Sequence, residues 1–505
     1  MKRVAVAALA IAACCPTPPR AASPSIATRP PPVEPGPTQP TPPPAPPPLD
    51  WSAAGVDWTA PPPADPEVAF APPVPTELRL SNGARVLVVE NHRLPLVSVR
   101  IAIESAGARS DGALLGLAAL TADLLDEGAG ARSALELPEE LARLGASLTV
   151  GAGADATELT LDTLAATLGP SLALTADVLM RPRLTADDFA RIKAERLADL
   201  ALRVDQPTAI ARLVFNRVVY GRHPYAPPIE GEVATVGKIQ AADVTKFFRA
   251  HYGPAAATIV VVGDVTVADA RGALEAALGR WTGKAARPKR PAAPAAAAPT
   301  LAFIDRPGAP QSVVALGRLG PDATDPAQAA HDLVNTALGG SFASRLNSAL
   351  REQKGYTYGV GSQFIRNQWA GTWRVFSQIR TDVTAPAIKD ALAIIAATAG
   401  APLPAEELAK TKALIIRGLP QGFETNAGIA GAYLGLALDG RPLTYYRDLP
   451  AALAAVTGDA GQRAAAAAWH DLTIVVVGDW AAVGADLAAL GLPIVRYDAD
   501  GHARP

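Results

Sequence analysis

Histidines are the side chains best suited to hold a catalytic metal, and the chain has six of them. A zinc site on a helix needs two imidazoles within about three to five residues of each other, with a glutamate placed to take a proton from metal-bound water. No two histidines in this chain are that close, so we interpret them as surface or structural residues. They are His92, His223, His251, His331, His470 and His502.

Cysteine chemistry is excluded for the folded part of the chain. The two cysteines, Cys14 and Cys15, are adjacent and close to the N-terminus. They therefore supply neither a disulfide framework nor a cysteine metal site for a globular domain, and thiol catalysis is excluded with them.

An arginine and a tyrosine in the C-terminal part could stabilise a developing negative charge. Arg351 and Tyr358 lie seven residues apart, with Gly355 between them ending an expected helix. A guanidinium and a phenol are hydrogen-bond donors suited to an oxyanion. Tyr356 is the rival for the phenol role. From residue types alone, a helix-end arginine and a strand or core tyrosine is the favoured interpretation.

The elements that must position this pair are interleaved helices and strands. Apolar periodicity predicts the following elements in the C-terminal part. They are strands near 301–305, 311–318 and 356–380 and helices near 325–338 and 341–353.

The N-terminal part shows the same mixture. It contains a hairpin from Glu77 to Val89 with Asn82-Gly83 at its turn, a strand from Leu96 to Glu104, a helix over 113–127, paired strands within 147–165, and a helix begun by Thr185 and Asp188. We therefore predict an α+β fold of two halves, each a mostly antiparallel sheet with helices packed on one face.

An internal repeat indicates that the two halves are homologous. Thr258–Asp264 recurs letter for letter as Thr473–Asp479, at an offset of 473 − 258 = 215 residues, about half of the folded length. An unbroken β-branched run closed by Gly-Asp is typical of a strand buried on both faces. We expect a tandem duplication.

Composition narrows the function further. The 505 residues are 49% hydrophobic and 19% charged, with a formal net charge of −2 and no long run of like charges. This is globular composition without the basic face that nucleic-acid binding requires, so we expect no nucleic-acid partner. Of the 48 prolines, 23 lie within 16–75, which predicts an extended tether.

The N-terminus has the features of an export signal. Lys2 and Arg3 precede an apolar run, Val4 to Ala13, that is too short to span a membrane. The end of this run, with Cys14 after two alanines, resembles the lipobox of bacterial lipoproteins. The resemblance implies cleavage before Cys14 and lipidation of its thiol; an ordinary secretory signal is the alternative. We expect an exported protein, lipid-anchored to a bacterial membrane and facing the periplasm.

Several landmarks in a fixed order resemble the insulinase/pitrilysin family of zinc metallopeptidases over essentially all of 75–495. The family fold consists of two homologous α+β halves that face each other across a chamber holding an unfolded peptide. The landmarks are Leu80–Val86, Gly116-Leu117-Ala118, His223-Pro224-Tyr225, His251-Tyr252, Val262-Gly263-Asp264, Ser344-Arg345-Leu346 and Gly355–Tyr358.

The resemblance locates a zinc motif that this chain lacks. Active members carry His-x-x-Glu-His directly after the Gly-Leu-Ala landmark, on a helix. The three ligand and base positions are here Ala119, Ala122 and Asp123, and Asp199 falls near the family's third, carboxylate ligand. Two aspartates do not make a catalytic zinc site, so we expect the chain to bind no zinc itself.

The resemblance also implies a role for the arginine and tyrosine. In the family, such a pair at a seven-residue spacing reaches from the second half to the zinc site, where it holds the substrate backbone and helps to stabilise the oxyanion. This spacing favours Arg351 with Tyr358 over Tyr356. Gly339-Gly340 falls where a non-catalytic family subunit carries a glycine-rich loop, but a helix-to-helix turn explains this short segment.

We accordingly expect six segments. They are a lipoprotein-type signal peptide (1–13), a Pro-rich tether (14–75), an N-terminal peptidase-like half (76–282), a Pro/Ala-rich linker (283–299), a C-terminal peptidase-like half (300–497) and a tail (498–505).

Three functions are compatible with these observations. The first is a non-catalytic, substrate-binding subunit of a heterodimeric zinc peptidase that cleaves unfolded peptides, with zinc and His-x-x-Glu-His in a sister subunit. The second is a structural or peptide-binding module with no share in catalysis. The third, a peptidase active on its own through unfamiliar ligands, is the least favoured. In each case the membrane is contacted through the lipid anchor only.

Overall fold

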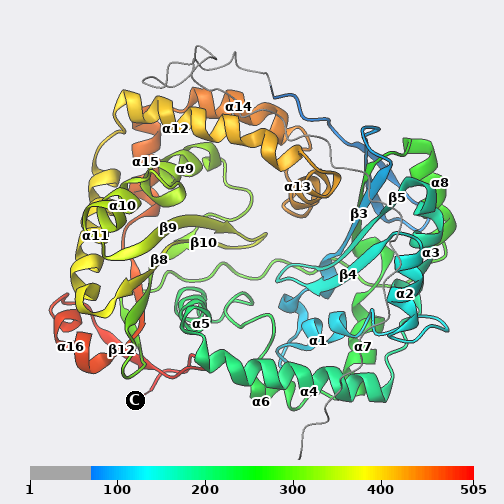
Figure 1. Ribbon diagram of the computed structural model, residues 1–505, viewed down its shortest axis with the longest axis horizontal. Coiled ribbons are helices and arrows are strands. Elements are labelled where there is room, and N and C mark those ends of the chain that lie inside the picture. Colours follow the sequence, from blue (N-terminus) through cyan, green and yellow to red (C-terminus); the bar gives the residue numbers. More distant parts are fainter. Residues whose placement is uncertain (1–69, 505) are drawn as a thin grey trace, which may run out of the picture. The chain divides into compact units, whose positions relative to one another are not determined.

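The computed structural model describes residues 70–504, which belong to one compact unit, Ala69–Pro505. The expected signal peptide, the expected lipidated Cys14 and the tether up to residue 69 lie outside the described residues. The described part consists of two halves, each built on a six-stranded sheet (Figure 1). This confirms the predicted α+β fold with two similar halves.

The first sheet has the strand order β1-β2-β6-β3-β5-β4, and its neighbours are antiparallel except for β2 and β6. The predicted hairpin is β1 with β2, and Gly83 at its turn has a φ of 91°, which glycine adopts without strain. The strands are β1 (Thr76–Arg79), β2 (Arg85–Glu90), β3 (Leu96–Ile103), β4 (Ser147–Ala152), β5 (Thr157–Leu164) and β6 (Ala257–Gly263).

The second sheet repeats this plan with the order β12-β7-β11-β8-β10-β9. The duplicated sequence forms β6 in one sheet and β11 in the other, and each of these is parallel to one neighbour and antiparallel to the next. The internal repeat is therefore a repeat of structure. The strands are β7 (Leu301–Asp305), β8 (Gln311–Gly320), β9 (Thr357–Arg366), β10 (Gly371–Arg380), β11 (Thr473–Gly478) and β12 (Ile494–Tyr497).

Two helices of the first half were predicted, and one of them, the helix begun by Thr185, has the predicted start. The backbone N–H of Asp188 donates to Thr185 Oγ1 over 3.1 Å, which confirms the predicted start of the long helix α4. The helices are α1 (Leu117–Asp123), α2 (Glu136–Arg143), α3 (Leu168–Met180), α4 (Ala186–Leu202), α5 (Pro207–Tyr220), α6 (Val233–Val236), α7 (Ala241–His251) and α8 (Val267–Leu278).

In the second half, the helices predicted over 325–338 and 341–353 are each split into an α-helical and a π-helical part. The π-helical turns are Thr336–Gly340 and Ser348–Gln353. The α-helices are α9 (Gln328–Asn335), α10 (Arg345–Asn347), α11 (Thr384–Gly400), α12 (Ala405–Gly418), α13 (Asn426–Leu438), α14 (Tyr445–Ala455), α15 (Gly458–Ala468) and α16 (Trp480–Ala488).

Helix α1 is much shorter than the helix predicted over 113–127. Gly116 precedes it with a φ of 93°, and a Cβ at this position would lie 2.7 Å from the carbonyl oxygen of Glu230. The chain turns sharply here so that its backbone can pack against the following segment. Leu124 and Leu125 remain buried beyond the end of α1, which is why the apolar pattern extends past the helix.

Each half contributes one helix that covers the sheet of the other half. On β6, Ile259 and Val261 face the helices of the first half, whereas Val260 and Val262 face α13 of the second half. Likewise α5 of the first half packs on Val475 and on neighbouring residues of the second sheet. Figure 1 shows α5 and α13 between the two sheets. The duplicated strands are thus buried on both faces, as predicted, because the halves exchange helices.

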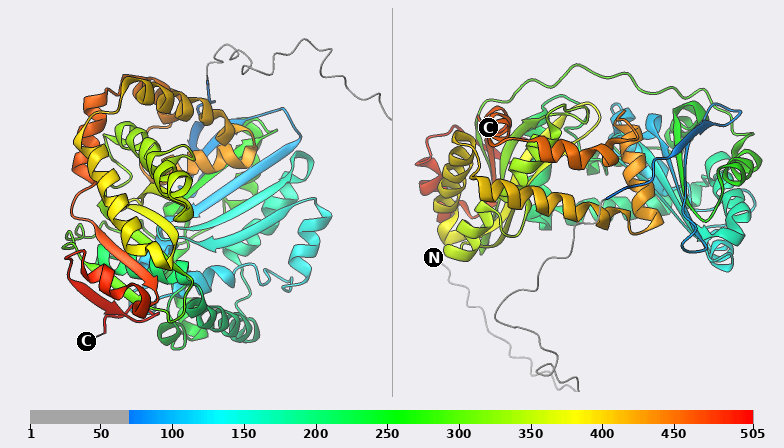
Figure 2. Two further views of the ribbon diagram at one scale, coloured as in Figure 1. Left: turned by 60° about the vertical axis from the view of Figure 1, so that its left-hand side comes forward. Right: turned by 90° about the horizontal axis from the view of Figure 1, so that it is seen from above.

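Residues 279–300 connect the halves without helix or strand. This segment runs from one half to the other (Figure 2, right), and contacts to both halves hold it in place. Arg287 Nε lies 2.9 Å from Glu104 Oε1, and Arg290 donates to the backbone oxygen of Trp369 over 2.8 Å.

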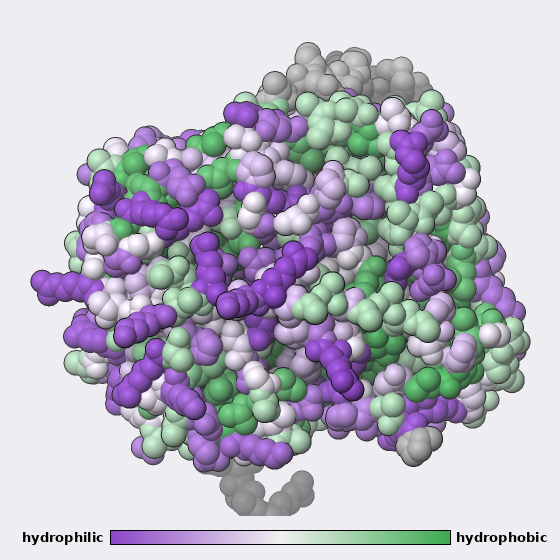
Figure 3. Space-filling view, turned by 180° about the vertical axis from the view of Figure 1, so that it is seen from behind, coloured by the Kyte–Doolittle hydropathy of each residue, from purple (hydrophilic) through white to green (hydrophobic). Residues whose placement is uncertain are grey.

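One segment of the described chain, Thr381–Gly400, is long and apolar enough to cross a membrane by length and composition. Its helix α11, however, packs Ile388, Ala391 and Ile395 into the core of the second half, as an ordinary core helix does. Hydrophilic side chains are spread over the face of the molecule seen in Figure 3.

Candidate functional site

The positions where a zinc helix would carry its ligands and base lie on α1. Ala119 and Ala122 are buried, with exposed fractions of 5% and 0%, and they present methyl groups to their surroundings. Asp123 is the last residue of the helix. Of these three side chains only Asp123 has an atom that could bind a metal ion.

The carboxylate of Asp123 is paired with a positively charged side chain of the protein itself. Arg196, on the neighbouring helix α4, forms this ion pair. Burial raises the pKa of Asp123, the bond to Arg196 opposes this effect, and the nearby charge of Asp199 adds to it. The charge of Asp199 on α4 thus acts on Asp123, and the group that pairs with Asp123 is a guanidinium of the protein itself.

These residues do not fit a zinc ion. Two methyl groups cannot replace two ligating side chains, and an aspartate paired with arginine is a poor ligand. Within residues 70–504, no group of three or more histidine, cysteine, aspartate or glutamate side chains is placed to hold a metal. No step of the chemistry is therefore assigned to a metal on this chain.

The ion pair of Arg196 was not predicted, although the sequence contains a signal for it. It precedes Asp199 by three residues on a predicted helix, so the two side chains share a helix face. A basic residue at that position is able to neutralise Asp123 only if α1 and α4 pack together, and that packing could not be read from the chain.

The start of α1 is held by a buried carboxylate. Asp111 accepts hydrogen bonds from the backbone N–H groups of Gly116 and Ala118, each over 2.7 Å. These groups would otherwise lack partners at the helix N-terminus. Burial raises the pKa of Asp111 to about 7, although the backbone donors favour its ionised form.

Because the pKa of Asp111 is raised by folding, the free energy of unfolding is expected to fall as the pH rises. Between about pH 4 and pH 7 the unfolded chain has released the proton of Asp111 while the folded chain still holds it, so the free energy of unfolding decreases across this window. We expect the melting temperature of the wild type to drop, relative to that of Asp111→Asn, as the pH rises from 4 to 7. A constant or increasing difference between the two proteins would contradict this expectation.

The predicted arginine lies at the end of a helix, as expected from its residue type. Arg351 belongs to the π-helical turn Ser348–Gln353. Its guanidinium donates to Glu352 over 2.7 Å and lies 4.5 Å from the ring centroid of Phe342, which is itself 70% exposed. The arginine is therefore partly oriented and still reaches solvent.

The predicted tyrosine is almost fully exposed. Tyr358 is the second residue of β9 and has an exposed fraction of 91%, whereas Tyr356 packs partly against the core of the second half. Gly355 turns the chain between helix and strand with a φ of 60°. The structure records no contact between the Arg351 and Tyr358 side chains, but both are accessible at the surface of the second half, whereas α1 lies in the first half (Figure 1).

The glycine pair lies in a packed turn. A Cβ on Gly339 would lie 2.6 Å from Ser362 Oγ on β9, and one on Gly340 would lie 3.1 Å from Asn335. The glycines therefore let the end of the α9 segment approach the sheet closely. This placement agrees with a helix-to-helix turn.

Three of the histidines have structural surroundings. His223 is buried in a turn, where its Nδ1 accepts from the backbone N–H of Tyr225 over 3.3 Å. His251 ends α7 and stacks on Phe247 with the ring centroids 4.3 Å apart. His331 pairs with Asp325 over 2.7 Å.

A buried polar network joins the two halves next to His223. Arg109, whose side chain is 1% exposed, pairs with Asp155 over 2.6 Å and donates to Gln368 over 2.6 Å. Its guanidinium also lies 3.9 Å from the ring centroid of Trp369. Asp155 accepts from the hydroxyl of Tyr225. We call these five residues the junction network; the sequence analysis singled out only Tyr225.

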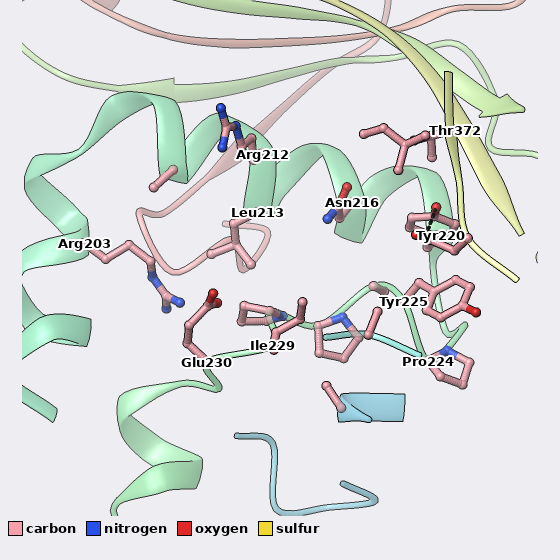
Figure 4. A pocket seen from close by; sticks show the side chains of 18 of the residues that line it. Arg203, Arg212, Leu213, Asn216, Tyr220, Pro224, Tyr225, Ile229, Glu230 and Thr372 are labelled. Atoms are coloured by element: carbon pink, nitrogen blue, oxygen red, sulfur yellow. Dashed lines mark hydrogen bonds between the residues drawn. The ribbon is translucent and has the colours of Figure 1, made fainter. Parts of the chain in front are cut away.

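A cavity of about 610 Å³ lies beside the junction network. The helices α4 and α5 and the loop 224–230 form its wall on the side of the first half, and residues of β9 and β10 complete it from the second half. Figure 4 shows Arg203 and Glu230 at one end and Tyr220, Tyr225 and Thr372 at the other.

Comparison with protein families and curated proteins gives consistent matches. The family described as the peptidase M16 inactive domain matches residues 238–415. An uncharacterized zinc protease of Mycobacterium tuberculosis is 28% identical over 307 residues, covering 59% of this chain and 68% of that protein. A non-peptidase homolog of Helicobacter pylori is 26% identical over 188 residues, covering 37% of this chain and 44% of that protein.

Solved structures are also similar to this chain. The peptidase M16 inactive domain from Pseudomonas fluorescens is 28% identical, with a TM-score of 0.76, covering 80% of this chain and 98% of that one. A protease from Helicobacter pylori, at 21% identity, has a TM-score of 0.75 and coverages of 80% and 99%. A chain of complex III from Candida albicans, at 16% identity, has a TM-score of 0.67 and coverages of 80% and 95%. The last two likenesses concern the fold alone.

Proposed function

Because this chain belongs to the insulinase, or M16, peptidase family and resembles its inactive members, we propose that it is the non-catalytic, substrate-binding subunit of a heterodimeric zinc peptidase. The partner is a sister subunit that carries His-x-x-Glu-His, and the substrate is an unfolded peptide. This chain binds no zinc of its own.

One observation carries the proposal: the arginine and tyrosine are accessible in a chain whose α1 cannot bind zinc. Because Ala119 and Ala122 are neither metal ligands nor bases, α1 has no zinc site that Arg351 and Tyr358 could assist. This helix also lies in the other half of the chain. An exposed fraction of 91% for Tyr358 is unusual for a tyrosine that serves only packing. The pair is instead available to a second polypeptide.

The role of the pair follows from its donors. The Tyr358 hydroxyl and the Arg351 guanidinium would donate hydrogen bonds to the substrate carbonyl oxygen as it gains negative charge. Arg351 stays charged at any physiological pH, so this assistance needs no proton transfer. The hydrolytic metal is supplied by the partner.

Free strand edges support binding of an extended peptide. Among the strands of residues 70–504, β4 pairs only with β5, and β9 pairs only with β10, so each lies at the edge of its sheet. An edge strand offers unpaired backbone groups to which an extended chain adds. Tyr358 lies on β9 itself, next to such groups.

The location of the protein is part of the proposal. The signal-like run before Cys14 and the Pro-rich segment 14–75 support an exported protein that is held on a bacterial membrane by its lipid and separated from it by an extended tether. Labelling with a radioactive fatty acid should mark the wild type and leave Cys14→Ala unlabelled. Labelling of that variant would contradict the assignment of Cys14.

Reconstitution tests the proposed function. The purified chain, a sister subunit carrying His-x-x-Glu-His, and their mixture are assayed on an unfolded peptide. We expect cleavage only by the mixture, abolished by a chelator. Full activity of the sister subunit without this chain would instead favour the structural or peptide-binding module with no share in catalysis.

A further inference from the structure

The cavity between the halves has an unusual lining. One stripe of α5 contributes Arg212, Asn216 and Tyr220, which follow one another at four-residue intervals along the helix (Figure 4). Residues four apart share a helix face. On the opposite wall, Thr372 and Arg374 of β10 are two residues apart and therefore share one face of the strand. Arg212 and Arg374 thus line the same cavity from different halves, and the charge of Arg212 is close enough to act on Arg374.

These two arginines have no carboxylate partner among residues 70–504. Arg212 makes no ion pair there and only lies 5.6 Å from the ring centroid of Phe376. Arg374 has the side-chain oxygen of Gln363 as its hydrogen-bond acceptor, over 2.9 Å. Burial, and secondarily the charge of Arg212, lower the pKa of Arg374. Arg374 is partly buried and Arg212 is exposed, so the site is open to solvent on the Arg212 side. Bringing these two like charges close together still costs free energy, which a bound anion would offset.

The other charges of the cavity do not neutralise this pair. Arg196 is already paired with Asp123, and Glu230 lies near Arg203 at the far end (Figure 4). Asp199 also lines the cavity, but on the α4 side near Arg196. The end formed by α5 and β10 thus keeps an excess of positive charge.

We propose that this end of the cavity binds a carboxylate group of a short unfolded peptide between Arg212 and Arg374. The inference rests on the proposed peptide-binding function and adds a substrate feature to it, namely a free C-terminal carboxylate or an acidic side chain. Asn216, Tyr220 and Thr372 supply neutral hydrogen-bonding groups beside it.

The lining favours a carboxylate of an organic ligand over phosphate. A planar guanidinium matches the two oxygens of a carboxylate in a forked pair. The remaining wall includes Leu213, Ile229 and Ile365, which are suited to the apolar part of a peptide. The lining contains neither glycine nor lysine, residues typical of phosphate loops. Its volume of about 610 Å³ is in the range of small-ligand sites.

Calorimetric titration of the full chain tests the proposal with three short apolar peptides, all acetylated at the N-terminus. The first has a free C-terminal carboxylate, the second is its C-terminally amidated twin, and the third is the amidated twin with one internal glutamate. We expect the first peptide, the third, or both to bind at least about 10-fold more tightly than the second. Comparing the first with the third identifies the terminal or the side-chain carboxylate as the ligand.

Variants locate the effect. The double variant Arg212→Gln with Arg374→Gln should remove the preference for the carboxylate. Arg212→Gln alone should reduce this preference, and it provides a test if the double variant does not fold because Arg374 is partly buried. Arg280→Gln, an exposed arginine outside the cavity, should keep the preference. Equal binding of all three peptides, an unchanged preference in a folded Arg212→Gln variant, or binding of inorganic phosphate alone would each overturn the proposal. Any of these results would overturn the carboxylate site without contradicting the proposed peptide-binding function. Failure of the reconstituted peptidase, in turn, would contradict the proposed function without removing a measured preference for the carboxylate.

Discussion

Replacing Tyr358 with phenylalanine is expected to lower the turnover of the reconstituted complex by about 100-fold, because removing one oxyanion donor typically costs two to three orders of magnitude in kcat. Arg351→Ala should have an effect of similar size. Both side chains reach solvent from the second half, so neither change should disturb the core. Turnover is measured on an unfolded peptide with saturating partner.

Matched variants separate this role from general damage to the surface. Tyr356→Phe alters the neighbouring, partly buried phenol, and Arg380→Ala alters an exposed arginine paired with Asp382 over 3.0 Å. Both should retain turnover close to that of the wild type. Complex formation, followed by gel filtration, should be unchanged in all four variants. Wild-type cleavage by Tyr358→Phe and Arg351→Ala would show that the pair is structural.

Arg109→Met is expected to destabilise the folded chain by about 3–5 kcal/mol, because breaking a buried ion pair leaves an uncompensated charge. Asp155 would keep its hydrogen bonds to Tyr225 and to the backbone of Gln368 but would lose its only ion-pair partner among residues 70–504. The urea midpoint of unfolding, followed by tryptophan fluorescence, reports the loss.

An exposed pair and a double variant provide the comparison. Arg380→Ala should change the free energy of unfolding by about 0.5 kcal/mol or less, as is usual for surface ion pairs. Adding Asp155→Asn to Arg109→Met should restore part of the lost stability, since the unpaired charge is removed. A loss below about 1 kcal/mol in Arg109→Met would mean that the junction network contributes little to joining the halves.

Periodicity and repetition were sufficient to predict the architecture. The duplicated run that forms β6 and β11 marked both the tandem plan and two strands buried on both faces, since only a covered strand is β-branched at every position. The hairpin at Asn82-Gly83 and the start of α4 at Thr185 depend on local rules, and the structure confirms both. Helix α1 was wrongly extended because buried residues continue beyond its end.

Contacts between distant segments could not be predicted. The exchange of α5 and α13 between the halves needs knowledge of tertiary packing, although the apolar character of α13 on nearly all sides hinted at burial between two layers. The ion pair of Arg196 with Asp123 and the junction network around Arg109 join residues 46 or more positions apart in the chain. Residue types alone do not reveal such pairs.

The metal content and activity of the isolated chain test the central claim most directly. After purification to homogeneity, zinc is measured by mass spectrometry and cleavage of an unfolded peptide is measured with and without chelator. We expect far less than one zinc per chain and no chelator-sensitive cleavage until the sister subunit is added. One tightly held zinc per chain, with cleavage that stops when the metal is removed, would contradict it.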